Sequence, residues 1–169
     1  MNRPQTFTRF VFGSRTTIAG TVYGTIVVLA VLGAGGKAYK DDLWRLVVIV
    51  VTTVLVLWMA HVYAHGLGES LHIGKRLSPA ELGSIASREL AIPLAAVGPA
   101  TILVLGAVGL LEGRTAEWLA FGLGVATLAI QGLRYAWVER LGLAGTIVAV
   151  SLNLALALVL VLLEVLVSH

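Results

Sequence analysis

The chain contains no cysteine and few charged residues, and both shortages limit what it can be. Without cysteine it forms no disulfide, holds no metal through thiolates and performs no thiol catalysis. Charged residues make up 12% of its 169 residues, 58% are hydrophobic, and the mean hydropathy is +0.94. A soluble domain of this size would leave about a third of its chain surface in water, and here that surface would be apolar. We therefore expect an all-α, polytopic integral membrane protein.

Clustered positive charge and catalytic motifs are also lacking. The formal net charge is +3, but the 12 lysines and arginines are spread between apolar segments and form no basic cluster. This distribution argues against a nucleic-acid partner. The sequence has no H-E-x-x-H, no G-x-S-x-G, no P-loop and no G-x-G-x-x-G between a strand and a helix. We therefore expect the lipid bilayer as the main partner, and no enzyme activity.

Uncharged stretches predict where the chain crosses the membrane, because a bilayer core about 30 Å thick needs about 20 helical residues. Four such stretches hold 21 to 23 residues, and a fifth, which begins at Trp118, holds 16. Arg134, at the end of the shorter stretch, can extend its side chain to the membrane surface. We predict about five transmembrane helices in a single domain over 1–169, at roughly 12–34, 43–65, 89–111, 116–137 and 141–166.

The positions of lysine and arginine predict the orientation, since positive residues near span ends are retained in the cytosol. With the N-terminus inside, eight of these residues are cytosolic, and four are outside, namely Lys37, Lys40, Arg45 and Arg114. We predict a cytosolic N-terminus, an external C-terminus and a plasma membrane of bacterial type. The first apolar run also fits a cleaved signal peptide, but it exceeds the usual length of about 7 to 15 residues.

The longest segment between predicted spans, 66–88, is expected to be a cytosolic insertion with a short amphipathic helix. Ser78 offers an N-cap, Pro79 suits the first helical position, and Glu81 completes a capping box. Apolar residues then recur at helical spacing, at Leu82, Ile85, Ala86 and Leu90. We expect this helix to lie on the membrane surface before the third span begins.

Two prolines predict kinks in the third span. Pro93 and Pro99 each remove one helical N–H and leave the carbonyl four residues earlier without its usual donor. Broken helices line some transport pathways, although a kink often serves shape alone.

Small residues form a stripe along the first predicted helix, at Gly13, Thr17, Gly20 and Gly24. The spacing of Gly20 and Gly24 allows two helix backbones to approach closely. The stripe predicts a packing face, either inside one subunit or at the seam of a homodimer.

The most chemically suggestive residues lie at the cytosolic end of the second span, where His61, His65 and Glu69 follow each other at intervals of four. They share one helix face, and His72 joins them if the helix continues. Imidazole and carboxylate suit a divalent first-row metal ion, and histidine is the side chain most easily titrated near neutral pH. The pattern predicts a metal or proton site, or else ordinary interfacial histidines.

Two amide side chains are predicted to lie inside the membrane, Gln131 in the fourth span and Asn153 in the fifth. An amide at this depth usually bridges helices, for about 0.6 to 2 kcal/mol, and less often lines a permeation path.

The predicted topology and two short motifs resemble the vacuolar iron transporter family. That family opens its first helix with V-x-G-x-x-D-G, of which Val11-Phe12-Gly13 keeps the first part without the Asp and Gly. Its second helix carries S-M-A-x-G-E-Y, and Met59, Ala60 and, after a one-residue gap, Tyr63 agree. The resemblance covers the first two helices only, lacks the family's acidic residues, and implies iron transport.

A second resemblance is to lysosomal-type potassium channels, whose first helix has R-x-x-x-F-S-D and whose second has W-x-x-H. Arg15 and Trp58-Met59-Ala60-His61 fit, whereas Ala19-Gly20-Thr21 stands in place of F-S-D. Two hypotheses follow from the sequence: a small cation transporter or channel that uses divalent metal or protons at His61 and His65, and a non-transporting membrane module that binds a partner protein.

Overall fold

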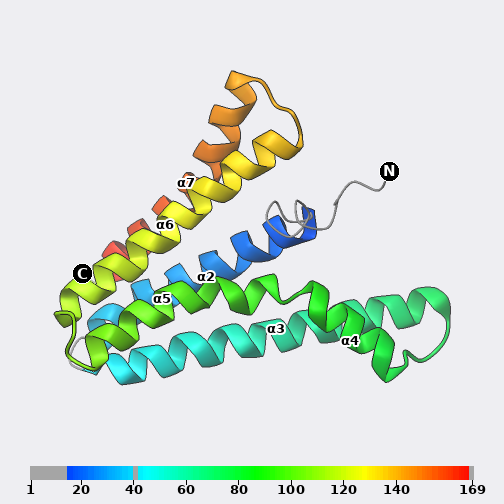
Figure 1. Cartoon of the computed structure of the whole chain (residues 1–169), viewed down its shortest axis with the longest axis horizontal. Coiled ribbons are helices and arrows are strands. Elements are labelled where there is room, and N and C mark those ends of the chain that lie inside the picture. The colour runs from blue at the N-terminus through cyan, green and yellow to red at the C-terminus, as the bar shows by residue number, and fades with distance from the viewer. Residues whose placement is uncertain (1–14, 40–41, 168–169) are drawn as a thin grey trace, which may run out of the picture.

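The computed structural model describes residues 15–39 and 42–167, and every regular element in this part of the chain is a helix. The helices are α2 (Arg15–Ala38), α3 (Leu43–Ile73), α4 (Pro79–Arg88), α5 (Ala91–Ala107), α6 (Gly113–Val138) and α7 (Leu143–Val167) (Figure 1). The all-α prediction is therefore confirmed for the described residues. The prediction for Gly13 concerns a residue outside them.

Several helices are long and apolar enough to cross a membrane. Three qualify singly, Thr17–Gly36, Leu43–Ile73 and Gly113–Val138, and the bent pair of α4 and α5 makes a fourth if it counts as one span. In α7 the apolar stretch Leu143–Val159 is shorter than these. Large apolar side chains also remain on the outside of the molecule, such as Leu143, which is 80% exposed. Such a surface suits lipid better than water, which indicates a membrane-integral protein.

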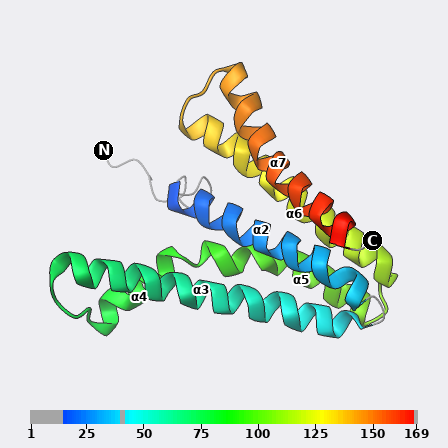
Figure 2. The same cartoon turned by 180° about the vertical axis from the view of Figure 1, so that it is seen from behind.

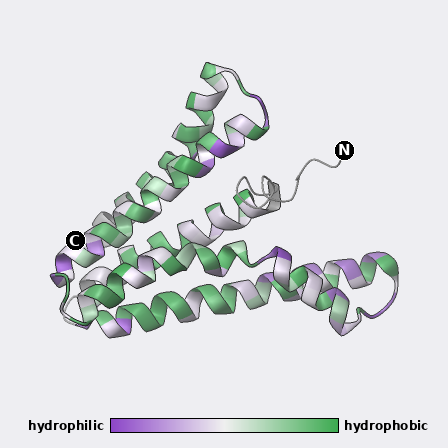
Figure 3. Ribbon diagram, in the orientation of Figure 1, coloured by the Kyte–Doolittle hydropathy of each residue, from purple (hydrophilic) through white to green (hydrophobic). Residues whose placement is uncertain are grey.

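The bundle is closed at one end and spread at the other (Figures 1 and 2). α2 contacts α3, α5, α6 and α7, whereas the α6–α7 hairpin leans away from α3 and α5 towards the end that carries α4. Figure 3 shows hydrophilic residues gathered around α4 and the α6–α7 loop, with hydrophobic ribbon along most of the helices. The spread end is therefore also the more polar end.

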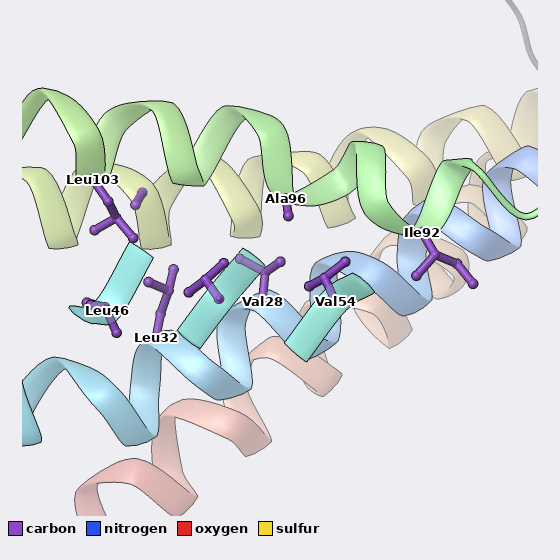
Figure 4. Close-up of a cluster of buried hydrophobic side chains, with 9 residues drawn as sticks. Val28, Leu32, Leu46, Val54, Ile92, Ala96 and Leu103 are labelled. Carbon is purple, nitrogen blue, oxygen red and sulfur yellow. The ribbon is translucent and has the colours of Figure 1, made fainter. Parts of the chain in front are cut away.

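The main core lies where α2, α3 and α5 meet, with one contribution from α6. Figure 4 shows its side chains, which belong to Val28, Leu32, Leu46, Val50, Val54, Ile92, Ala96, Leu103 and Ala120. A smaller cluster of Leu29, Leu128 and Ala157 joins α2 to α6 and α7. The larger core thus holds α2 to α3 and α5, and the smaller one holds it to the hairpin.

The helix α3 runs further than the predicted span 43–65, through Gly66 and Gly68 to Ile73. Gly66 is buried, and a Cβ there would lie 3.0 Å from Cδ2 of Leu82 in α4, so this glycine serves helix packing. The helix ends instead at Gly74, which has a left-handed φ of 66°. With 31 residues, α3 is about 46 Å long, which exceeds the roughly 30 Å bilayer core.

The helix α4 begins as the sequence predicts, at a capping box. The Ser78 N–H donates to the Glu81 carboxylate at 2.7 Å, and the Glu81 N–H donates to the Ser78 hydroxyl at 3.3 Å. Part of its apolar face packs on protein, because Ile85 is buried and the indole of Trp58 in α3 donates to the Ala86 carbonyl at 3.2 Å. This face is therefore not wholly available to a membrane surface.

The bend at the start of the third predicted span lies ahead of both prolines. The axes of α4 and α5 meet at 48°, at the break between Arg88 and Ala91. Pro93 sits in the first turn of α5, where a missing N–H disturbs no helical bond. In a continuous helix its ring would clash with the Glu89 carbonyl, which here accepts from the Ile92 N–H at 3.0 Å. Pro99 lies inside α5 and is buried.

Candidate functional site

The two predicted histidines lie together on α3. The rings of His61 and His65 are 6.0 Å apart between centroids, and the Tyr23 ring of α2 lies 4.7 Å from the His61 ring. Tyr23 was not predicted as a site residue from the sequence. The one feature that could have indicated it is its position next to Gly24 of the small-residue stripe on the first helix. Its partner lies 38 positions away in the chain, so only the packing of α2 on α3 brings the two rings together.

His65 also has a partner that the sequence did not reveal. Its Nδ1 lies 3.1 Å from Oε1 of Glu89, at the junction of α4 and α5. The Glu89 side chain is 18% exposed, whereas that of His65 is 59% exposed. A protonated imidazole at this distance forms a charge-assisted hydrogen bond with a carboxylate. The pair therefore ties the C-terminal half of α3 to the bend before α5.

Glu69 and His72 take separate positions on the continued helix. Glu69 lines a cavity of about 360 Å³ between α3 and α4, together with His65, Glu81, Arg88 and Glu89. His72 is exposed. Among the residues that the structure describes, no three histidine or acidic side chains are grouped so that they would hold a metal ion.

The carboxylate of Glu81 in this cavity is held mainly by its own helix. The pKa of Glu81 is lowered from its usual 4.5, first by the backbone N–H of Ser78 and then by the Ser78 hydroxyl, with Lys75 adding a smaller attraction. The Lys75 ammonium lies 3.4 Å from Oε1 of Glu81. Glu81 is therefore part of the helix cap first, whereas Glu69 and Glu89 face the cavity without such a cap.

The two predicted intramembrane amides share a second cavity, of about 420 Å³, between α2, α6 and α7. Besides Gln131 and Asn153, it is lined by Ile18, Ala19, Val22, Tyr23, Ile26, Tyr135, Val138 and Glu139. Gln131 is 5% exposed, and its Oε1 accepts from the Arg134 guanidinium at 3.2 Å. Asn153 donates through Nδ2 to the Ala149 carbonyl of its own helix at 3.2 Å. Neither of these two hydrogen bonds crosses between helices.

Tyr23 joins the two regions. It contacts His61 on one side and lines the cavity that holds Gln131 and Asn153 on the other. The predicted histidines and amides therefore belong to one series of polar residues. It runs from Glu89 and His65 through His61 and Tyr23 to Gln131 and Asn153. The sequence identified most members of this series but not the order in which they lie.

The small-residue stripe on α2 is a packing face within the chain. A Cβ at Gly20 would lie 3.0 Å from the Ala91 Cβ of α5, and one at Gly24 would overlap the Ile92 carbonyl oxygen. Thr17 lies one turn earlier, and its carbonyl accepts from the Thr21 hydroxyl at 2.8 Å. Because α5 covers Gly20 and Gly24, this face gives no support for a homodimer seam.

Comparison with protein-family models, with curated proteins and with solved structures finds no match to this chain.

Proposed function

We propose that the protein is a proton-coupled transporter with five spans, a cytosolic N-terminus and an external C-terminus, in a plasma membrane of bacterial type. The fifth span is α7, and α5 serves as the third, entered through the bend at Glu89. The eight-to-four distribution of positive residues supports this orientation. It puts α4 and the spread end of the bundle in the cytosol.

The observation that carries the transport proposal is the position of Tyr23, between His61 and the cavity of Gln131 and Asn153. Glu89, His65 and His61 make a series of proton-carrying groups that leads from the cytosolic bend to this tyrosine. Neutral imidazole has one donor and one acceptor nitrogen, so it can pass a proton on without leaving its place. The gap between the two histidine rings is short enough for a rotation or one bridging water.

The cavity suits a compartment with access from one side. Its lining residues come from the first half of α2 and the second half of α6, at the end where the α6–α7 hairpin leans away (Figure 1). Towards the other end, α2 and α6 close on each other, because Leu29 is fully buried and occupies the space beside Gly124. A transporter needs such an asymmetry, which reverses as it works.

A proton-flux assay tests this proposal. We expect protein in liposomes to dissipate an imposed pH gradient when a cation is supplied on the other side, with Fe²⁺, Mn²⁺, Zn²⁺ and K⁺ as a panel. His61→Ala and His65→Ala should lower the rate by about tenfold or more, as for other lost proton-transfer groups, and Glu89→Gln should weaken it.

His72→Ala is the matched control, because His72 is on the same helix but exposed; its rate should equal that of the wild type. Proton movement no faster than in empty liposomes for every ion, or equal rates in all variants, would refute the proposal.

The orientation is tested separately with single cysteines, since the chain has none of its own. In intact cells the Ser78→Cys variant should resist an impermeant maleimide, and the Ser168→Cys variant should react. Permeabilised cells provide the control, in which both should react. The opposite labelling pattern would reverse the topology.

A partner-binding membrane module is the second candidate. It is favoured by an apolar groove of about 720 Å³ between α3 and α5, which includes Val51, Leu55, Leu94 and Val97. Its one hydroxyl, on Thr101, donates to the Val97 carbonyl at 2.7 Å. The flux assay separates the candidates, because only the transporter moves protons.

A further inference from the structure

We propose that the cavity between α2, α6 and α7 binds a small amphipathic molecule whose head group is uncharged and both donates and accepts hydrogen bonds. A primary carboxamide and a protonated carboxylic acid have such a head. The inference goes beyond the proposed function, because the ligand is a neutral molecule and not one of the cations of the flux assay. Binding itself is tested without transport.

Gln131 provides the first half of the argument. It is 5% exposed, and its only hydrogen bond among the described residues uses Oε1, which accepts from Arg134. Among the described residues, every buried side-chain nitrogen or oxygen that solvent cannot reach has a hydrogen-bond partner. Nε2 of Gln131 has no partner, so it must be accessible to solvent. The accessible space beside Gln131 is the cavity that it lines. Its N–H groups are donors without acceptors in an apolar surrounding.

Asn153 provides the second half. Its Nδ2 donates to the Ala149 carbonyl at 3.2 Å, which leaves Oδ1 without a donor among the described residues. Gly132, next to Gln131, lets α6 and α7 pack closely, because a Cβ there would lie 3.0 Å from Nδ2 of Asn153 and 2.9 Å from the Val150 Cα. The cavity thus holds a free donor on α6 and a free acceptor on α7.

The charge of the head group follows from these atoms. A carboxylate would meet the donor of Gln131 but be repelled by Oδ1 of Asn153 and by Glu139, which also lines the cavity. Oδ1 of Asn153 and the Glu139 carboxylate would attract a cation, but a cation would leave the N–H groups of Gln131 without an acceptor. A neutral group that offers one acceptor and one donor satisfies both amides, and unpaired amides in an apolar medium are costly.

The remainder of the lining fixes the other end of the molecule. Ile18, Val22 and Ile26 form an apolar wall along α2, beside the open face of Ala19. A volume of about 420 Å³ lies in the range of small-molecule sites. The ligand should therefore have an apolar body of modest length behind its head group.

Protection of a single cysteine tests the site directly. The Ala19→Cys variant, in lipid nanodiscs, is treated with N-ethylmaleimide, and its modification rate is followed by mass spectrometry. Octanamide should slow this modification with saturation. The Thr101→Cys variant is the control for general partitioning into lipid, because Thr101 lines the separate groove of α3 and α5.

Two substitutions in the Ala19→Cys background separate the two amides. Gln131→Leu should raise the half-protecting concentration of octanamide by roughly 3- to 10-fold, and Asn153→Leu should do the same, the effect of one lost hydrogen bond. Methyl octanoate accepts but does not donate, so it should respond to Gln131→Leu and not to Asn153→Leu. Ser151→Ala, at an exposed position on α7, should leave both probes unaffected.

The outcomes are distinct from those of the flux assay. Equal protection of the Ala19→Cys and Thr101→Cys variants, or a half-protecting concentration unchanged by both leucine substitutions, would overturn the site and leave only general uptake of apolar molecules. An unchanged modification rate without probe shows that each variant keeps its fold. Selective protection without any proton flux would keep the site and refute transport.

Discussion

The two sides of α2 differ in how closely they are packed. On one side lies α5, which approaches so closely that a Cβ at Gly24 would overlap the Ile92 carbonyl oxygen and one at Gly20 would lie 3.0 Å from the Ala91 Cβ. On the other side lies the α6–α7 hairpin, which meets α2 at Leu29 but leaves a cavity beside Ala19 and Tyr23. One helix therefore has a closed face and an open face along the same few turns.

This difference separates the tightly packed pair of α2 and α5 from the α6–α7 hairpin, which is less tightly held. Close backbone contact joins α2 and α5, and Glu89, the partner of His65, lies at the junction just before α5. The part of the proposed proton path formed by Glu89, His65 and His61 thus lies on the closed side, and its end at Tyr23 lies beside the cavity. The hairpin is held by a smaller core, whose buried members are Leu29, Leu128 and Ala157. A change in the tilt of this hairpin would alter the cavity and leave the histidines in place.

The largest effect should come from filling the closed side. In the Gly24→Leu variant the new side chain would overlap the backbone oxygen of Ile92 and lie within 3.0 Å of the Ala95 Cβ at its first carbon. Backbone atoms cannot rotate away, so α2 and α5 must separate, which should cost about 1 to 3 kcal/mol or more. Thermal unfolding in detergent, followed by circular dichroism, measures the loss.

Gly122→Ala is the matched control for this substitution. Gly122 also lies inside a helix, α6, but a Cβ there would meet nothing within 4 Å. Alanine should therefore leave stability unchanged or raise it by up to about 1 kcal/mol, through helix propensity. A Gly24→Leu protein as stable as the wild type would show that α2 and α5 do not approach closely at Gly24.

Local features of the fold were predictable from the sequence. The start of α4 is an example, because Ser78, Pro79 and Glu81 make their cap within four consecutive residues. The long apolar helices are likewise encoded by uncharged runs. The end of α3 was less predictable, since Gly66 resembles a stop signal unless Leu82 is known to lie against it. The break at Glu89 was displaced from Pro93 because a proline disturbs the turn before it.

The candidate site was predictable only in its separate parts. His61 and His65 follow from helical spacing, and Gln131 and Asn153 stand out as amides in apolar runs. Their connection through Tyr23 depends on the packing of α2 against α3 and α6, which no local pattern encodes. Glu89 was missed for the same reason, because its contact with His65 arises from the 48° bend between α4 and α5.

The smallest expected effect is a loosening of the first turn of α4 at acid pH. The pKa of Glu81 is lowered in the folded chain by the Ser78 backbone and hydroxyl donors. The folded state therefore favours the ionised carboxylate, and this stabilisation is complete above the usual pKa of 4.5. It is lost as the pH falls through the lower pKa of the folded state.

A nitroxide on the Ala80→Cys variant, at an exposed position in the first turn of α4, reports this change through its mobility in electron paramagnetic resonance. Mobility should stay low at neutral pH and rise as the pH falls through the lowered pKa of Glu81, because protonated Glu81 no longer accepts from the Ser78 N–H with full charge. Adding Glu81→Gln should make mobility independent of pH in this range, since the amide keeps the capping geometry without the charge. Adding Ser78→Ala should raise mobility at every pH, by the loss of about 1 kcal/mol of capping.

The same label on the Ala19→Cys variant should not respond, because Glu81 does not line that cavity. A rise at both positions would mean that acid loosens the whole bundle, and that the two sides of α2 are not independent.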